Sequence, residues 1–235
     1  MGSKITFYIA RHGRTILNSL NKVQGWSDTP LTKEGIEVAE NLGKGLRDIK
    51  FSSAYCSDLR RTRETINIVL NNSGQKELTV VEKPEFREIC FGAYETAFAT
   101  EMFKDVALYL HYTKVEDLFA DIFDKNKEIT YKDAVNTISI LDPMKMAEDF
   151  NTVEKRTHKA LNEIVEKENK YNEDRNVLIV SHGLSITLML HNLGGKKLFV
   201  KDLDNASICK VLYEDGKFMI ESVNDMSYVD KGQNS

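Results

Sequence analysis

The stretch Ile5-Thr6-Phe7-Tyr8-Ile9-Ala10-Arg11-His12-Gly13 decides the fold that this sequence predicts. Its first six residues are apolar, aromatic or β-branched and indicate a buried strand that ends at a basic pair and a glycine. A second stretch, Asn176-Val177-Leu178-Ile179-Val180-Ser181-His182-Gly183, has the same form. The carboxyl ends of parallel strands open at one edge of a sheet, where α/β proteins bind ligands. We therefore expect His12 and His182 to converge at that edge.

Strands and helices alternate on either side of these two stretches. Helical spacing of apolar residues predicts helices over about residues 33–46, after residues 57–58 and after Pro143. Short β-rich runs at residues 54–56 and 78–81 predict two more strands. Ser57 and Asp58 are placed to cap the helix that carries Arg61. The alternation predicts a three-layer αβα sandwich with a mainly parallel central sheet.

Two other parts of the chain depart from this alternation. From about residue 93 to residue 142 helical patterning takes over, which predicts an inserted helical lobe. Its aromatic residues are expected to form the lobe's own core: Tyr109, Tyr112, Phe119 and Phe123. Near the end, residues 208–213 and 218–223 flank an Asp-Gly turn and predict a closing hairpin, followed by a polar tail from about Asp230. We expect one domain over residues 1–235 with this insertion.

Composition excludes several classes of function. Hydrophobic residues make up 41% and charged residues 29% of the chain, as in ordinary globular enzymes. A net charge of −4 and a pI near 5.8 argue against broad binding of nucleic acid or anionic lipid. The three cysteines are odd in number and lack metal-ligand spacing, and no apolar run is long enough to span a membrane. We expect a cytoplasmic protein without a metal, nucleic-acid or membrane partner.

Two further segments bring charged side chains to the expected edge of the sheet. Arg61 follows the second strand, and Glu88 lies in the loop after the third strand. Guanidinium groups from Arg11 and Arg61 suit phosphoryl transfer, because the transferring oxygens carry negative charge. The same cations should lower the pKa of His12 and keep its nitrogen nucleophilic. Glu88 is the carboxyl group of this set that can protonate a leaving alcohol.

These segments also carry a specific resemblance. The sequence resembles the phosphoglycerate mutase-like branch of the histidine phosphatases, and the phosphatases more than the mutases. The resemblance is carried by four ordered motifs over residues 4–92 and 148–195: Arg11–Asn18 continued by Gln24–Thr32, Tyr55–Thr65, Phe86–Gly92 and Val180–Gly183. It implies a metal-independent phosphatase that needs no cofactor and passes through a phosphohistidine on His12. It also implies Glu88 as the acid, and phosphate contacts from Arg11, Arg61, His182, Asn18, Gln24, Gly25 and Gly183.

The sequence departs from the family pattern after the acid loop. Many relatives continue with Trp-Glu-Gly, whereas this chain has Tyr94-Glu95-Thr96. The mutases carry several arginines in the following region, yet none occurs here between Arg87 and Arg156. This favours hydrolysis of a small phosphorylated metabolite. Two alternatives stay open, a phosphoglycerate mutase and a regulatory module that binds phosphate with little turnover.

Overall fold

The computed structural model describes residues 3–124, 126–193, 200 and 202–235, and a single sheet organises this part of the chain. Its strands run in the order β3-β2-β4-β1-β5-β6. They are β1 (Ile5–Arg11), β2 (Ser53–Cys56), β3 (Val80–Glu82), β4 (Arg175–Ser181), β5 (Ile208–Glu214) and β6 (Lys217–Asp225). The first four are parallel, and the hairpin β5–β6 is antiparallel. The prediction of a mainly parallel sheet is confirmed.

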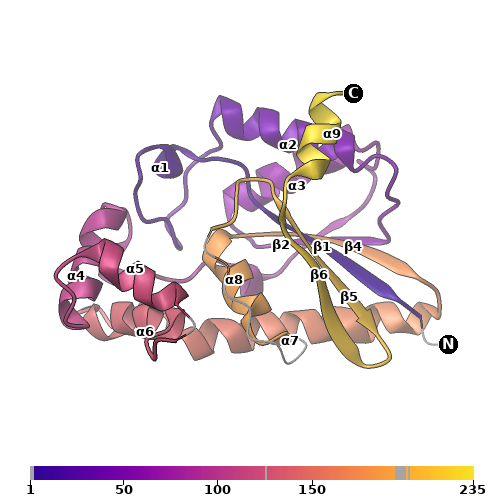
Figure 1. Ribbon diagram of the computed structural model, residues 1–235. Coiled ribbons are helices and arrows are strands. Elements are labelled where there is room, and N and C mark those ends of the chain that lie inside the picture. Colours follow the sequence, from indigo (N-terminus) through magenta and orange to yellow (C-terminus); the bar gives the residue numbers. More distant parts are fainter. Residues whose placement is uncertain (1–2, 125, 194–199, 201) are drawn as a thin grey trace.

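Helices cover both faces of this sheet and also form a separate group beside it (Figure 1). α2 (Lys33–Gly45), α3 (Arg60–Asn72) and α9 (Ser227–Gln233) lie over one face, and α7 (Phe150–Glu168) and α8 (Gly183–His191) over the other. The remaining helices are α1 (Ile16–Ser19), α4 (Ala99–Tyr109), α5 (Val115–Phe123) and α6 (Tyr131–Leu141), with short 3₁₀ turns at Pro84–Phe86, Gly92–Tyr94 and Asn169–Tyr171. No helix in the described residues combines the length and hydropathy of a membrane span.

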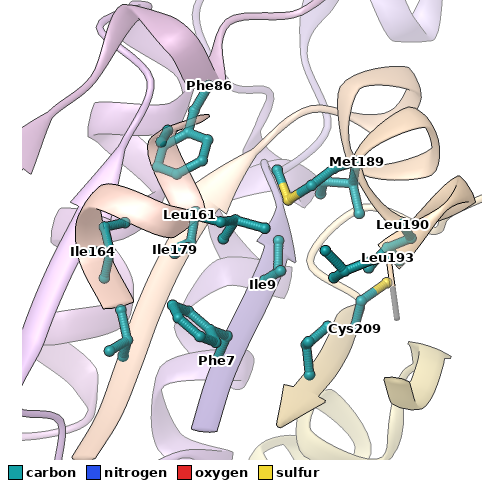
Figure 2. Close-up of a cluster of buried hydrophobic side chains, with 14 of the residues drawn as sticks. Phe7, Ile9, Phe86, Leu161, Ile164, Ile179, Met189, Leu190, Leu193 and Cys209 are labelled. Carbon is teal, nitrogen blue, oxygen red and sulfur yellow. The ribbon is translucent and has the colours of Figure 1, made fainter. Parts of the chain in front are cut away.

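The two faces of β1 feed two different cores because side chains alternate along a strand. Phe7 and Ile9 pack with Leu161 of α7 and Met189 of α8, as Figure 2 shows. Residues on the other face of β1 pack beneath α2 and α3. A strand that is buried on both faces reads as a continuous apolar run, which is why the opening stretch predicted its strand well.

The helical patterning between residues 93 and 142 forms α4, α5 and α6, which share a third apolar cluster. The expected aromatic core of this lobe is partly wrong. Leu118 and Ile122 supply the buried face of α5, whereas Phe119 and Phe123 are only partly buried and Tyr109 is 47% exposed. Aliphatic side chains fill the interior instead, and the aromatic rings lie nearer its surface.

The predicted tail from about Asp230 is polar and mostly exposed, but residues 227–233 also form helix α9 against α2, which was not predicted. Two glycines make this close packing possible. A methyl group added at Gly45 would lie 1.8 Å from the Tyr228 carbonyl oxygen, and one added at Gly232 would lie 1.8 Å from the Asn41 carbonyl oxygen. The third strand differs in its bounds, since its pairing with β2 runs from Val80 to Glu82 rather than over residues 78–81.

Candidate active site

A cleft of about 190 Å³ opens where β1 and β4 end. Its wall contains six of the nine residues that the sequence predicted for the site: Arg11, His12, Asn18, Gln24, Glu88 and Gly183. Arg11 is paired with Ser181 where the two strands end. The residues that follow them, His12 and His182, therefore lie at the same edge of the sheet. The predicted convergence of the two histidines is also present, with ring centroids 5.2 Å apart.

One hydrogen bond of His12 fixes which ring nitrogen carries the proton. Its Nδ1 lies 2.7 Å from the carbonyl oxygen of Gly13, which can only accept, so Nδ1 carries the proton. Nε2 therefore keeps its lone pair. The turn is held by a close backbone approach, since a methyl group at Gly13 would lie 2.4 Å from the Gly35 carbonyl oxygen. The unprotonated Nε2 has the form that a nucleophilic histidine requires.

The pKa of His12 lies well below its usual value of 6.5. Burial is the largest cause, since the side chain is only 4% exposed, and the charges of Arg61 and Arg11 lower the pKa further. The pKa is therefore lowered, as predicted. The prediction attributed the shift to the neighbouring cations, however, whereas desolvation has the larger effect. The ring is neutral near pH 7.

Arg11 and Asn18 each present a donor to the cleft. One terminal nitrogen of Arg11 donates to the Leu203 carbonyl oxygen, whereas the buried Nε has no hydrogen-bond partner among the described residues. A buried donor without a protein partner is typical of a ligand-binding position. Asn18 accepts the Thr15 N–H through Oδ1, which leaves its NH₂ group to meet a ligand.

Glu88 faces the same cleft and caps the N-terminus of α8. Its Oε1 accepts the backbone N–H groups of Ile89 at 3.0 Å and Ser185 at 2.8 Å, and its Oε2 accepts that of Leu184 at 3.1 Å. A carboxylate oxygen has two lone pairs, so Oε1 is fully used and Oε2 keeps one. Oε2 is therefore the oxygen with room for a transferable proton.

Three predicted residues lie behind the cleft rather than in its wall: Arg61, His182 and Gly25. The Arg61 guanidinium is fully buried and donates to Gly25, Ser27 and Asp28, and its Nε donates to His182 Nδ1 at 3.1 Å. His182 therefore carries its proton on Nε2, which lies 2.8 Å from Ser57 Oγ. In this arrangement the charge of Arg61 lowers the pKa of His12. Contact of Arg61, His182 and Gly25 with phosphate stays a prediction.

The N-terminus of α3, which carries Arg61, is held differently from the prediction. Ser57 and Asp58 do not cap it, because Ser57 is bonded to His182 and Asp58 forms a two-pronged ion pair with Arg87. The first N–H of the helix, at Arg60, instead donates to Asp28. Asp28 also pairs with Arg61 at 2.9 Å, so this carboxylate fixes the helix end and the Arg61 side chain together.

Sequence reasoning missed Arg156, which fastens the loop that carries Glu88. Its guanidinium on α7 donates to the backbone carbonyl oxygens of Glu85, Arg87 and Glu88. Two further bonds at 2.9 Å join it to Glu148. No local pattern signals this role, because the three carbonyl groups that it holds lie about 70 positions earlier in the chain. Arg156 is a positioning residue for Glu88.

Glu95 holds the opposite loop in a similar way. Its two carboxylate oxygens accept four backbone N–H groups, those of Gly25, Trp26, Ser27 and Phe91. A side chain at Gly25 has no space, since an added methyl group would lie 2.1 Å from the Ile89 carbonyl oxygen. Glu95 therefore ties residues 25–27 to the acid loop, and the carbonyl oxygens of Gly25 and Ser27 in this stretch accept hydrogen bonds from Arg61.

The rest of the cleft wall was not predicted and is mostly apolar. It includes Val23, Phe91, Met102 and Leu184, together with Tyr131 and Asp202. The pKa of Tyr131 is raised by burial and by the carboxylates of Glu88 and Asp202, so its hydroxyl stays protonated. Among the described residues no group of three or more His, Cys, Asp or Glu side chains is arranged to hold a metal ion.

Comparison with known proteins identifies the family of this chain. The sequence model of the histidine phosphatase superfamily (branch 1) matches residues 7–226. The chain belongs to this superfamily. The motifs of the first strand, the second arginine, the acid loop and the second histidine thus lie in one matched region that spans nearly the whole chain.

Relatives within the superfamily carry different names. A crystal structure titled phosphoglycerate mutase, from Bacillus anthracis str. Sterne, is 39% identical, with a TM-score of 0.90 over 99% of this chain and 98% of that one. Bacillus stearothermophilus YhfR is 25% identical, with a TM-score of 0.73 over 96% of this chain and 99% of that one. A curated relative, the probable phosphoglycerate mutase GpmB of Yersinia pestis (strain Pestoides F), is 28% identical over 95% of this chain and 94% of its own length.

Proposed function

We propose that this protein is a phosphomonoesterase that works through a phosphohistidine on His12. Nε2 of His12 attacks phosphorus, and the bond from phosphorus to the ester oxygen breaks as Glu88 Oε2 delivers a proton to that oxygen. The alcohol leaves. Glu88, now a carboxylate, takes a proton from water, whose oxygen attacks the phosphohistidine and releases inorganic phosphate. Histidine and carboxylic acid are both regenerated.

The observation that carries this proposal is the pairing of His12 and Glu88 across one cleft. His12 Nδ1 is committed to Gly13, so Nε2 is the free nitrogen, and Glu88 keeps a lone pair on Oε2. Arg11 lines the cleft with an unpaired buried Nε, and Arg61 adds its charge from behind. Fixed cationic donors of this kind stabilise the charge on a transferring phosphoryl group.

Phosphoglycerate mutase is the second candidate, favoured by the names of the relatives at 39% and 28% identity. A mutase must also hold the carboxylate of phosphoglycerate and retain the phosphohistidine. Among the described residues that line the cleft, Arg11 is the only lysine or arginine, and those beyond the predicted set are apolar, acidic or carry a hydroxyl group. This lining favours hydrolysis over isomerisation.

One experiment separates the two candidates. Purified protein is assayed for release of inorganic phosphate from a panel of phosphomonoesters, and for isomerisation of 3-phosphoglycerate primed with 2,3-bisphosphoglycerate. We expect phosphate release that His12→Ala abolishes, with isomerisation at or near background. Fast primed isomerisation would favour the mutase. Ligand binding without either reaction would favour a regulatory module.

A further inference from the structure

A second and larger cavity, of about 720 Å³, adjoins the cleft that contains His12. Four residues line both cavities: Phe103, Tyr131, Leu184 and Asp202. The remaining wall of the larger cavity comes from helix α5, which contributes Val115, Glu116, Phe119, Ala120 and Phe123. The volume lies in the range of small-molecule sites, and the shared wall places this space beside the expected position of the phosphate.

Helix α5 presents to this cavity an apolar face that is only partly used in packing. Val115, Phe119 and Phe123 follow one another at spacing four and so share a face. The lobe is packed by a different face of the helix, where Leu118 is 0% and Ile122 is 4% exposed. Contiguous apolar groups that stay partly open mark binding surfaces.

Aromatic contacts shape this face into a wall. The ring of Phe119 meets that of Phe103 edge to face, with centroids 5.0 Å apart, and is stacked with that of Phe123 at 6.4 Å. These contacts join α5 to α4 and hold the rings beside Leu184, which follows the second histidine motif. An apolar group that extends from a bound phosphate therefore meets aromatic carbon on several sides.

The charges in the described part of the cavity wall select against anionic groups. Glu116 and Asp202 are the charged residues in the described part of its wall, and both are acidic. A carboxylate or second phosphate placed here would face like charge without a described cation to pair with it. An uncharged group has no such penalty.

Resting on the phosphatase activity proposed above, we propose that this cavity receives the leaving group, and that the substrates are phosphomonoesters of uncharged, apolar alcohols or phenols. The lobe formed by α4, α5 and α6 is then the part of the fold that selects the substrate. Phosphorylated acids and bisphosphates are disfavoured.

A series of n-alkyl phosphates from ethyl to hexyl tests this inference. The leaving alkoxides are nearly equal in basicity, so all the esters need the proton of the general acid to the same extent. Differences in kcat/KM therefore report contacts of the alkyl group with the protein. Burial of one methylene group contributes enough free energy for up to about fourfold in affinity. We expect kcat/KM to rise about two- to fourfold per added methylene. A flat or falling series would overturn the inference while leaving the phosphatase intact.

A pair of variants locates the effect. Ala120 is exposed on α5 and lines the cavity, so Ala120→Glu places a carboxylate there with little threat to folding. We expect it to remove most of the chain-length dependence, so that hexyl phosphate loses more of its kcat/KM than ethyl phosphate does. Leu108 on α4 is 72% exposed and does not line the cavity, so Leu108→Glu is the matched control and should keep the dependence. If both variants showed the same dependence of kcat/KM on alkyl chain length, the alkyl group would bind outside this cavity.

A binding measurement tests the same inference without depending on turnover. Calorimetric titration with ethylphosphonate and hexylphosphonate, which resist hydrolysis, should give tighter binding of the longer chain by about 10-fold or more, and Ala120→Glu should abolish the difference. Equal affinities would overturn the inference. Absence of phosphate release from every ester, together with chain-dependent phosphonate binding, would contradict the proposed hydrolysis but support an apolar ligand.

Discussion

Replacement of Glu88 by glutamine tests both the acid role and the hydrogen bonds that hold the carboxylate. Glutamine keeps one acceptor oxygen and converts the other into an NH₂ group. The less costly orientation keeps the bonds from Ile89 and Ser185 and turns NH₂ toward the Leu184 N–H. A backbone donor that loses its acceptor costs about 1 to 3 kcal/mol. For a chain of this size that corresponds to a fall of about 2 to 12 °C in Tm.

The effect on catalysis should depend on the leaving group. An alkoxide is a strong base and needs a proton in the transition state, so hexyl phosphate should lose about 100-fold or more in the phosphorylation of His12. Phenoxide leaves more readily, and phenyl phosphate should lose much less. Rapid-quench measurement of a single turnover isolates this step from the later hydrolysis, in which Glu88 also acts.

Glu85→Gln is the matched control for this experiment. Glu85 lies in the same loop, but its side chain does not line the cleft. It should keep near-normal rates with both esters. Equal losses for hexyl and phenyl phosphate in Glu88→Gln would refute the acid role and leave Glu88 as the cap of α8 alone.

Three further predictions follow from the same contacts. Arg156→Lys cannot hold the three carbonyl oxygens of the acid loop, so kcat for alkyl phosphates should fall about 10- to 100-fold with little change in KM. Arg175→Lys is the control, because Arg175 begins β4 at the end away from the cleft; it should change neither kcat nor KM. Because burial lowers the pKa values of His12 and His182, the unfolded chain takes up protons below pH 6.5 that the folded chain does not. The free energy of unfolding, measured with urea, should therefore fall as the pH drops below 6.5, and His12→Asn should reduce the slope by about 1.4 kcal/mol per pH unit. Activity in a chelator such as EDTA should equal that without it, since arginines supply the positive charge; a loss that Mg²⁺ or Zn²⁺ restores would contradict this.

The sheet and its ligand edge could be predicted because their signals are local. A strand buried on both faces reads as a continuous apolar run. The run over residues 5–10 is followed directly by Arg11 and His12, so it also marks the position of the site. The long helix α7 was equally readable, since each apolar position predicted for its inner face, such as Phe150 and Ile164, is buried.

The parts that sequence reasoning missed depend on contacts between distant residues. Helix α9 was missed because Tyr228 and Val229 are too few to show a helical period; it packs on α2 because Gly45 lets its backbone approach that helix. Arg156 and Glu95 look like ordinary charged residues, and only the folded chain brings their partners to them. Burial of the site is also invisible in sequence, which explains why the main cause of the low pKa of His12 was missed.

Trapping of the phosphoenzyme tests the central claim most directly. The protein is mixed briefly with phenyl phosphate, quenched in base, where phosphohistidine survives, and analysed by peptide mass spectrometry and ³¹P NMR. Because His12 Nδ1 is bonded to the Gly13 carbonyl oxygen, we predict one phosphoryl group on Nε2 of His12, and none in His12→Ala. Phosphate release without any phosphohistidine, or a phosphoryl group on another side chain, would contradict the account.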